Sequence, residues 1–592
     1  MCLLNKGLKY CLKNNCKNKK TFVKTTLGAE AAIKSMKKED RNAARVLVSR
    51  KLNRFLNKAY IGPKTRQNNN MEAKVAKRLC SKLELNGAMI TKADKGNTTI
   101  IMYKKDYVEK VYQFIEKNNI SKISNDPTKK FSIAVNKALN ESKELFREHE
   151  IRQLKVINPK APELKGLLKL HKPDEPIRPL VNFRTSSAYK IAQKLDTLIR
   201  SNIIFETNYS LRNNIDFVNK VKNLQVEPSH TLVSFDIESL YTNVPVAETL
   251  KILEKRLVES KKLTKLAIEQ LINLLTTVLQ QNYFSFENEY FCQTDGLAMG
   301  SPLSCILAEI FLNEVETNHI FSEENRQLGK ILHYCRYVDD VFVIYNGNRR
   351  QIQTFHNYLN KIHNNLKFTL ELETNGTLNY LDLSVSKTNA NKLEFKIFRK
   401  PTTTDHTIHN TSNHPQAHKL AAFNSYVHRL LSIPMSEDSY ENERAVLKQI
   451  AMANGYNPNI IDTLIKKLKK KKQQQKMENE TKKYLCMEYN EELQYTFRNV
   501  FASLGYSLSF KANQNLEGLL KSKSSSTDKY LNTGVYKLNC TECSMYYIGQ
   551  TGRSFKTRFS DHLPKRKTSQ SPQKSKFADH LVQYNHSVDS TA

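Results

Sequence analysis

The segment that most constrains this chain is Arg336-Tyr337-Val338-Asp339-Asp340, which is followed by an apolar run from Val341 to Tyr345. Aspartate favours turns, and the valine, isoleucine and aromatic residues after the pair favour a β-strand. Two adjacent carboxylates at a turn beside a strand suit the binding of divalent metal where a triphosphate reacts. A surface hairpin with two solvated acids is the alternative interpretation of the same residues.

Charge and composition narrow the class of partner. The 592 residues leave room for about three to four domains, and 93 lysines and arginines exceed 58 acids by 35. The excess is spread along the chain, which favours a polyanion such as nucleic acid as the partner. Ten cysteines without a disulfide framework favour a reduced, intracellular location.

The sequence carries little sign of a membrane or secretion signal. No run of about 18 or more apolar residues is present, and the basic, Asn-rich start lacks the apolar core of a signal peptide. We therefore expect neither membrane insertion nor secretion. The lysine-rich run from Lys466 to Lys472 fits a nuclear import signal, acting after synthesis in the cytoplasm, and equally fits a solvated basic linker.

Asp236 is a second source of carboxylate, because it ends the apolar strand-like run Leu232–Phe235. An aspartate that caps a helix is the alternative interpretation. Between Asp236 and the acid pair, Gly300-Ser301-Pro302 precedes an apolar segment typical of a helix, Cys305–Glu316. Glycine allows close backbone approach to a nucleotide or template, and proline suits a helix start. A simple glycine-rich loop remains the alternative. The order of the three motifs in the chain distinguishes best between the catalytic and the simple structural interpretations.

With these motifs in this order, the chain resembles a reverse transcriptase. Asp236, Asp339 and Asp340 match the catalytic aspartates of the palm, which the resemblance implies hold two Mg²⁺ ions, and Met299-Gly300-Ser301-Pro302 matches the motif that grips template and nucleotide. The implied fold is α+β, a right-hand polymerase followed by a linker and a small α/β domain. The expected regions are a basic helical N-terminal region (1–85), fingers and the start of the palm (86–230), the palm (231–400), a helical thumb (401–465), a basic linker and connector (466–530) and a C-terminal unit (531–592).

The resemblance narrows to the Penelope-like retroelements, which are related to telomerase reverse transcriptases, over about residues 85 to 430. It is carried by the segments Lys92–Thr99, Leu170–Lys172, Ile177–Pro179, Tyr380–Leu383 and Arg399–Thr402. The resemblance implies an RNA template, a DNA primer, target DNA and deoxynucleoside triphosphates as partners. Oligomeric state is not indicated.

The same resemblance implies roles for four further residues. Lys95 and Arg178 of the fingers contact the incoming triphosphate, Tyr241 blocks a 2′-hydroxyl, and Lys367 gives a proton to pyrophosphate. Each has a structural alternative: an ion pair of Arg178 with an acid such as Glu175, a core position for Tyr241, and a lysine stem packed on a sheet edge for Lys367.

The C-terminal unit contains two strand-like pieces with Tyr536 and Tyr547, followed by a helix with Arg558 and His562 on one face. It resembles a GIY-YIG endonuclease, the companion domain of many Penelope-like elements, which nicks target DNA to provide a primer. In that resemblance the two tyrosines help to activate water, and Arg558 holds the scissile phosphate with His562 nearby.

Cys540 and Cys543 lie within this unit, and His580 and His586 follow. Two cysteines with two residues between them and two histidines make a tetrahedral Zn²⁺ site possible. The 36 residues between Cys543 and His580 exceed the spacing of a C2H2 finger, so solitary surface histidines are the alternative. A similar group recurs in Penelope-like elements, and this resemblance favours zinc.

One feature departs from the GIY-YIG pattern, which includes a metal-binding glutamate on a later helix. No glutamate follows Glu542. We therefore expect a remnant with DNA affinity and little cleavage, from a truncated genomic copy or an incomplete gene model.

Two alternatives to a retrotransposon polymerase remain. One is a decayed or repurposed, non-catalytic nucleic-acid-binding protein. The other is a telomerase-like reverse transcriptase, and the GIY-YIG-like C-terminal unit disfavours this second alternative.

Overall fold

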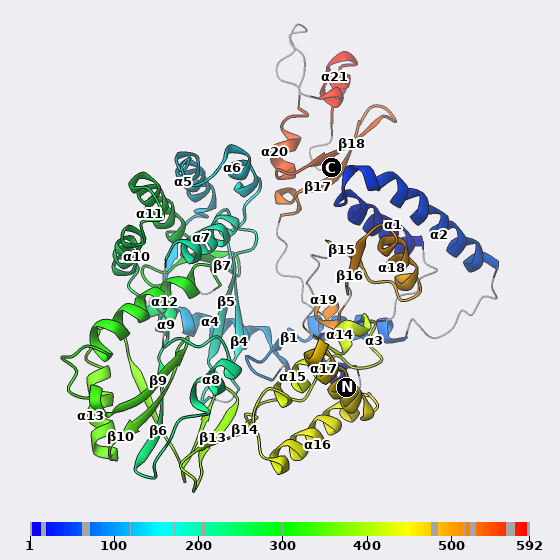
Figure 1. Cartoon of the computed structure of the whole chain (residues 1–592). Helices are drawn as coiled ribbons and strands as arrows, with labels where there is room; N and C mark the ends of the chain where they lie inside the picture. Colours follow the sequence, from blue (N-terminus) through cyan, green and yellow to red (C-terminus); the bar gives the residue numbers. More distant parts are fainter. Residues whose placement is uncertain are drawn as a thin grey trace.

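The computed structural model describes residues 3–12, 19–61, 71–96, 98–118, 120–170, 172–203, 209–298, 300–474, 483–512, 515–520, 528–563 and 575–588. Helices and mostly antiparallel sheets are mixed along the chain (Figure 1), so the expected mixture of helix and sheet is confirmed. None of the described helices is both long and apolar enough to cross a membrane.

A four-stranded antiparallel sheet lies at the centre of the predicted palm, in the order β11-β6-β10-β9. Its strands are β6 (His230–Ile237), β9 (Ile331–Tyr337), β10 (Asp340–Asn346) and β11 (Phe368–Leu372). All five residues from Val341 to Tyr345 are buried. The sheet is covered on both faces, which explains why β10 is a continuous apolar run.

Helices cover one face of this sheet, and a second sheet with a short helix covers the other. The first face packs against α10 (Val246–Ser260), α11 (Lys265–Leu279), α12 (Ser304–Val315) and α13 (Arg349–Leu359) in one hydrophobic core. The second core is formed with α8 (Asn214–Val221) and the sheet β12-β13-β14 (Thr377–Tyr380, Leu383–Lys387, Leu393–Ile397).

The predicted fingers (86–230) contribute β3, β4 and β5 to a five-stranded sheet in the order β3-β8-β7-β4-β5, and they also contain a separate hairpin. Strands β7 and β8 of this sheet come from the region predicted as palm (231–400). The sheet comprises Ser121–Ile123, Glu289–Cys292, Tyr283–Phe286, Glu163–Leu168 and Ile177–Asn182, and the hairpin is β1 (Ala88–Lys92) with β2 (Thr99–Tyr103). The predicted fingers also contain the helices α4 (Lys104–Lys117), α5 (Thr128–Glu141), α6 (Glu148–Leu154) and α7 (Tyr189–Asn202). A bridge between Ala93 and Leu168 fixes the hairpin turn to the end of β4.

The region expected to be helical contains α14 (Gln416–Lys419), α15 (Ala421–Leu430), α16 (Glu437–Ala453) and α17 (Asn459–Gln474). Their shared core includes Phe423, Leu447 and Ile461, all fully buried. The lysines of the run Lys466–Lys471 are exposed on the C-terminal half of α17, whereas Leu468 between them packs against this core, so these lysines lie on a helix.

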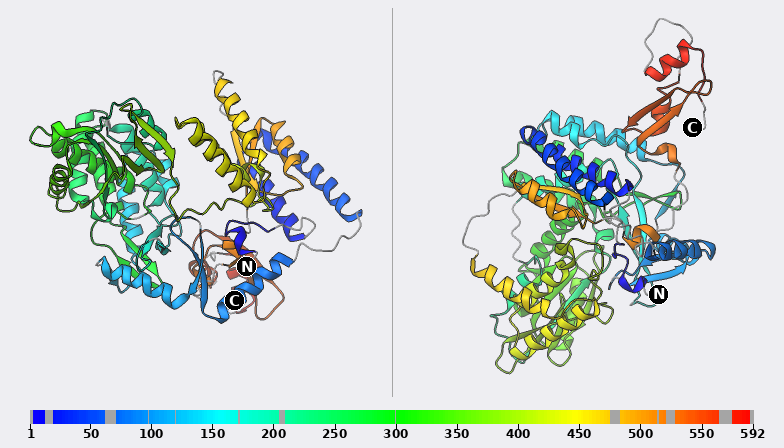
Figure 2. Two further views of the ribbon diagram at one scale, coloured as in Figure 1. Left: turned by 90° about the horizontal axis from the view of Figure 1, so that it is seen from below. Right: turned by 90° about the vertical axis from the view of Figure 1, so that its right-hand side faces the viewer.

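The expectation of a linker over 466–530 is wrong for 483–511. These residues form β15 (Lys483–Glu488), α18 (Gln494–Ala502) and β16 (Tyr506–Lys511), with the strands parallel. They share a core with α1 (Lys19–Lys34) and α2 (Arg41–Ile61), and the two segments lie side by side in both views (Figures 1 and 2). The buried apolar side chains of this segment explain why it folds. Residues 475–482 and 521–527 lie outside the described residues.

The start of the chain also packs on distant segments. Residues 3–12 share a small core with α3 (Met71–Leu85) and α19 (Leu516–Leu520). The described helices of the N-terminal region, α1, α2 and α3, are therefore packed against residues from the predicted connector. The C-terminal unit contains the hairpin of β17 (Gly534–Asn539) and β18 (Tyr546–Thr551), with α20 (Phe555–Phe559) and α21 (Lys576–Gln583).

Candidate active site

The three predicted catalytic acids meet at one end of the central sheet. Asp236 on β6 and Asp340 on β10 are direct cross-strand partners. Asp339 lies in the turn before β10, and its carbonyl oxygen accepts a hydrogen bond from the amide of Ile237 at 3.0 Å. Pairing of β6 with β10 therefore brings carboxylates about 100 residues apart in sequence to the same sheet edge.

A buried arginine, Arg336, supports the turn that carries the acids. Val338 in this turn adopts a left-handed conformation with φ 57°, which is unfavourable for a β-branched residue. The guanidinium of Arg336 donates to the carbonyl of Val338 at 3.1 Å and pairs with Glu316 at 2.5 Å and Glu309 at 3.1 Å. Sequence reasoning missed this role, although a charged residue inside an apolar strand was a signal for it.

The acids raise one another's pKa. Burial, and then the neighbouring charges of Asp339 and Asp236, raise the pKa of Asp340 to about 6. The pKa of Asp236 is raised by burial and by Asp339. Carboxylates that converge on one point and resist ionisation together fit a site for hard divalent cations, because a bound cation removes their repulsion. The residues present therefore fit the two Mg²⁺ ions that the resemblance implies.

Replacing Asp340 by asparagine should stabilise the metal-free protein. The folded pKa of about 6 lies above the ordinary value of about 3.9 for aspartate. Stability is therefore lost as pH rises from about 4 to 6, and at pH 7.5 the variant gains about 1 kcal/mol after allowance for solvent screening. Thermal unfolding in EDTA measures this gain, which should vanish near pH 4. A gain that is constant from pH 4 to 8 would contradict the assignment.

Cations line the same cleft as the acids. A cleft of about 930 Å³ is lined by Asp236, Asp340, Lys95 and Lys400, among others. Arg178 on β5 pairs with Asp94 in the β1–β2 turn, with 3.2 Å between Nε and Oδ1. The ion pair with an acid that was the alternative for Arg178 is therefore present, with Asp94 and not Glu175 as the partner. Burial and then Lys400 lower the pKa of Lys95. Of the two predicted phosphate ligands, Lys95 thus lies in the β1–β2 turn and Arg178 lies on β5, and the ion pair with Asp94 joins the two elements.

Sequence reasoning missed further cations around the acids. Burial, and then Arg178, lower the pKa of Lys169. The charges of Lys172 and Lys400 act on Asp236 and favour its ionised form. Lys172 and Lys400 both occur in family-like segments, which was the available signal, whereas nothing local marks Lys169. His171 lies outside the described residues.

The glycine-rich loop lies against both the fingers and the palm. Gly300 has φ 105°, and a Cβ there would lie 2.4 Å from the carbonyl oxygen of Val181 on β5. Gly296 is equally constrained, because a Cβ would lie 2.2 Å from the carbonyl oxygen of Thr242. Ser301 and Pro302 follow, and α12 begins at Ser304. The glycines are therefore required for close packing, and Met299 lies outside the described residues.

Tyr241 and Lys367 both follow Asp236 in the chain and have different surroundings. The hydroxyl of Tyr241, on α9 (Leu240–Asn243), lies 3.4 Å from Sγ of Cys305, and both residues line a second cavity of about 330 Å³. Lys367 is 73% exposed at its side chain and lies 3.5 Å from Glu238. It does not line the described cleft that holds the acids.

The four residues predicted for the nuclease unit are brought together. The Tyr536 hydroxyl lies 2.7 Å from Nε2 of His562 and accepts a hydrogen bond from Nε of Arg558 at 3.0 Å. The ring of Tyr547 lies 5.0 Å from that of His562. His562 is fully buried, its Nδ1 lies 2.7 Å from Ser575 Oγ, and burial lowers its pKa. Both ring nitrogens of His562 thus have a hydroxyl group within hydrogen-bonding distance.

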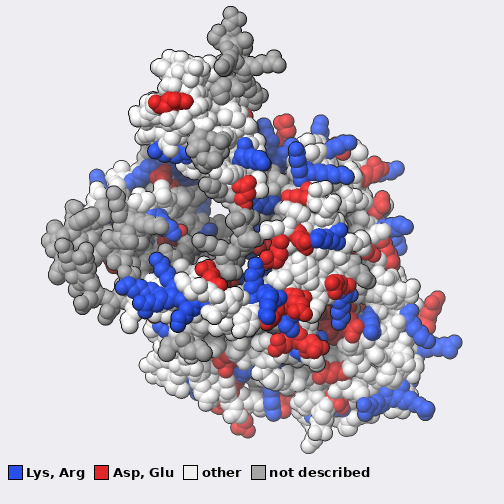
Figure 3. All heavy atoms as spheres, turned by 180° about the vertical axis from the view of Figure 1, so that it is seen from behind, with Lys and Arg blue, Asp and Glu red and all other residues white. Residues whose placement is uncertain are grey.

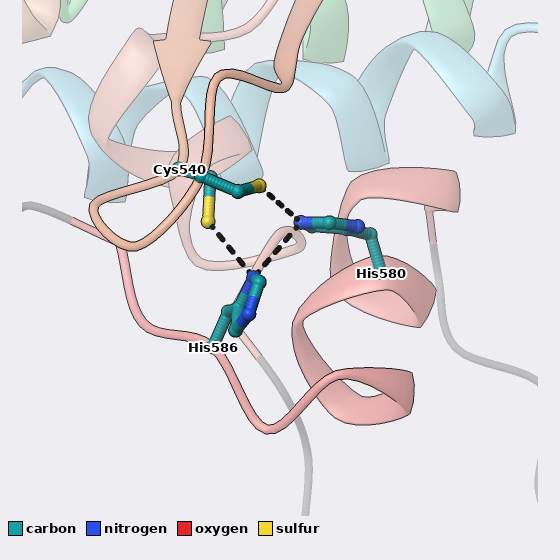
Figure 4. Close-up of side chains that lie close together, drawn as sticks. Cys540, His580 and His586 are labelled. Atoms are coloured by element: carbon teal, nitrogen blue, oxygen red, sulfur yellow. Dashed lines mark hydrogen bonds between the residues drawn. The ribbon is translucent and has the colours of Figure 1, made fainter.

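The predicted zinc ligands also converge. One ligand atom from each of Cys540, Cys543, His580 and His586 lies within 4.8 Å of the others. Cys540 Sγ is 3.3 Å from His586 Nδ1, and His580 Nε2 is 3.4 Å from both Cys543 Sγ and His586 Nδ1 (Figure 4). Two thiols and two imidazoles at one point are the donor set of structural Zn²⁺, so these residues fit the ion.

Comparison with known proteins identifies two regions. Residues 170–377 match the family model of reverse transcriptase (RNA-dependent DNA polymerase), and residues 406–466 match the animal helix-turn-helix domain. No curated protein matches the chain. The helix-turn-helix match covers most of α14 to α17 and was not predicted.

Solved structures similar to this chain include two telomerases. The telomerase of Candida albicans with a fragment of telomeric RNA is 12% identical, over 71% of this chain and 68% of that chain, with a TM-score of 0.43. The apo telomerase of Candida tropicalis is 12% identical, over 83% of this chain and 80% of that chain, with a TM-score of 0.41. The family match confirms the predicted reverse transcriptase domain. The chain is an RNA-directed DNA polymerase, a nucleotidyltransferase.

Proposed function

We propose that this chain is the polymerase of a Penelope-like retrotransposon, which extends a DNA primer by copying RNA. The observation that carries this proposal is the convergence of Asp236, Asp339 and Asp340 at one end of the central sheet, inside the matched domain, where Asp236 and Asp340 line a cleft together with Lys95. Acids and cations in one cleft suit a metal-bound triphosphate.

In this proposal, Asp236 and Asp339, with the help of Asp340, would hold two Mg²⁺ ions. The chemistry that these ions would supply is a lower pKa of the primer 3′-hydroxyl and neutralisation of charge on the pyrophosphate. Lys95 and Arg178 bind the phosphates and orient the α-phosphate toward the primer, and Arg336 keeps the acid turn in place. A proton-donating role for Lys367 stays a prediction.

In this proposal the net positive charge of the chain attracts the template and primer. Lysine and arginine side chains are spread over the face shown in Figure 3, with acids between them. The exposed lysines at the end of α17 add positive charge beside the helix-turn-helix region. This charge favours binding to nucleic acid backbones. The same lysines serve as the proposed nuclear import signal.

We propose that the C-terminal unit is a GIY-YIG-like module that binds DNA and cleaves it poorly. Support comes from the cluster of Tyr536, Arg558 and His562. The acid that contacts this cluster is Asp561, and it pairs with Arg553 and with Arg558, 3.3 Å away. A carboxylate engaged by two arginines is a poor metal ligand. The zinc ligands keep the module folded.

Replacing Tyr241 by alanine should relax discrimination against ribonucleotides. The hydroxyl of Tyr241 lies beside Cys305 at the start of α12, and in this proposal the second cavity, which both residues line, receives the sugar of the nucleotide. Removal of a steric block is expected to raise the ratio of ribonucleotide to deoxynucleotide incorporation by about 10-fold to 100-fold. Single-nucleotide insertion kinetics with matched dNTP and rNTP measure the ratio. An unchanged ratio in a folded, active variant would contradict the role.

The proposed function is tested by primer extension with purified protein, Mg²⁺ and a DNA primer on an RNA template. Asp339→Asn provides the matched control, because the amide keeps the shape and removes the charge. Extension by the wild type alone supports the proposal. Folded wild-type protein that binds the duplex without extending it would favour the non-catalytic alternative.

A further inference from the structure

Lys400 comes from a part of the chain far from the fingers, yet it lines the same cleft as the acids. It follows β14 and precedes the helix-turn-helix region. The cleft is shared with Asp236, Asp340 and Lys95. The charge of Lys400 acts on both acids and favours their ionised forms. Lys400 is therefore close enough to influence any anion bound between them.

The backbone around Lys400 touches the fingers turn directly. Gly96 adopts φ 79°, and a Cβ there would lie 2.3 Å from the carbonyl oxygen of Thr402 and 3.2 Å from the amide nitrogen of Thr404. Only glycine permits this approach. Lys95 directly precedes Gly96, and Lys400 lies two residues before Thr402, so this contact brings the two lysine segments together, and both lysines line the cleft.

The two ammonium groups form a like-charged pair without an acidic partner among the described residues. The nearest acid in the fingers turn, Asp94, is paired with Arg178. Neither Lys95 nor Lys400 makes an ion pair with a described carboxylate within 4.0 Å. Two cations held together at a cleft wall repel each other until an anion lies between them. The phosphate groups of a nucleotide or a nucleic acid are the anions that a polymerase binds.

The segment that carries Lys400 is anchored to the helical region. The neighbouring Arg399 makes a two-point pair with Glu443 of α16, at 2.6 and 2.5 Å, and Glu443 is buried. The amide of Thr403 donates to the carbonyl of Lys400 at 2.8 Å, which closes a turn. The position of Lys400 therefore depends on α16 and not only on the central sheet.

We propose that Lys400 is a substrate-binding residue that grips the triphosphate of the incoming nucleotide together with Lys95, and so links nucleotide binding to the helix-turn-helix region. The inference rests on the proposed function, because the nucleotide is the substrate of that reaction. It assigns a phosphate contact to a segment outside both the fingers and the matched reverse transcriptase domain. The backbone phosphates of primer or template are the other source of the same chemistry, and the test separates the two.

The test compares Lys400→Ala and Lys400→Arg with a matched control, Lys396→Ala. Lys396 lies on β14, is exposed, and its Nζ is 3.9 Å from Glu394. Three quantities are measured: KM for dNTP in primer extension, Kd for the primer–template duplex, and Kd for radiolabelled dATP in equilibrium dialysis with Ca²⁺. We expect Lys400→Ala to weaken both nucleotide constants about 10-fold or more, with duplex affinity unchanged. Arginine should restore most of the loss.

Three results would overturn the inference: unchanged nucleotide constants, weaker duplex binding at an unchanged dNTP KM, or an equal effect of Lys396→Ala. The dialysis arm needs no turnover, so it separates this inference from the proposed function. Wild-type protein that extends primers while Lys400→Ala behaves identically refutes the inference alone. Wild-type protein that neither binds dATP nor extends a primer refutes both. A thermal melt of each variant confirms that it is folded.

Discussion

Asp236→Asn is expected to reduce primer extension on the order of a thousandfold, as the loss of a central electrostatic group in an active site does. Asparagine keeps the size and the cross-strand position opposite Asp340 but carries no charge to hold a divalent cation. Because the carboxylates at this edge repel one another, the variant should be at least as stable as the wild type. Single-turnover extension and a thermal melt on the same samples measure both effects.

Glu371→Gln is the matched control for this prediction. Glu371 lies on the adjacent strand β11 and lines the same cleft, but its cross-strand partner is Ser234 and not an acid. We expect its replacement to change extension by less than about threefold, because Glu371 is not paired across the sheet with an acid and so does not share their cation. Equal losses in the two variants, or full activity of Asp236→Asn, would contradict the assignment of the catalytic acids.

Zinc removal is expected to unfold the C-terminal unit. Its core consists of Leu538, Cys540, Phe577 and Leu581, with a few half-buried neighbours. So small a core contributes little stability, whereas structural Zn²⁺ supplies about 10 kcal/mol or more in zinc-finger peptides. Protein purified without chelators should hold one zinc per chain. EDTA, or Cys543→Ser, should abolish hydrogen-exchange protection across β17, β18 and α21.

The control for zinc is Cys486→Ser, because Cys486 is an exposed thiol on β15, outside the ligand cluster. This variant should retain its metal and its exchange protection. The palm should keep its protection in EDTA, because its two cores share no residue with the C-terminal unit. Absence of stoichiometric zinc, or the same protection with and without EDTA, would refute the metal site.

The central acids were predictable from sequence because each follows or precedes a local pattern. Asp236 ends an apolar strand, and Asp339 and Asp340 precede another, so antiparallel pairing of the two strands was enough to bring them together. The predicted zinc ligands converge for a similar reason, since cysteine and histidine pairs are chemically distinctive. The glycines before α12 were recognised, although their contacts with Val181 and Thr242 were not.

The remaining features depend on contacts between residues far apart in sequence. The packing of α1 and α2 on β15, α18 and β16 joins segments more than 400 residues apart, and a lysine-rich neighbourhood hid the apolar positions of these strands. Arg336 was visible as a charge in a strand, but its partners Glu309 and Glu316 lie on another element. Lys400 carries no local sign that it faces the acids. The pattern of apolar residues along the chain does not predict such contacts between distant segments.

Sequencing of the DNA product made on an RNA template of defined sequence tests the central claim most directly. Purified full-length chain, a DNA primer, Mg²⁺ and four dNTPs should yield DNA complementary to the RNA. Asp339→Asn should yield only unextended primer, and digestion of the RNA beforehand should abolish synthesis. Product unrelated to the template, or folded protein that binds the duplex and extends nothing, would contradict the account.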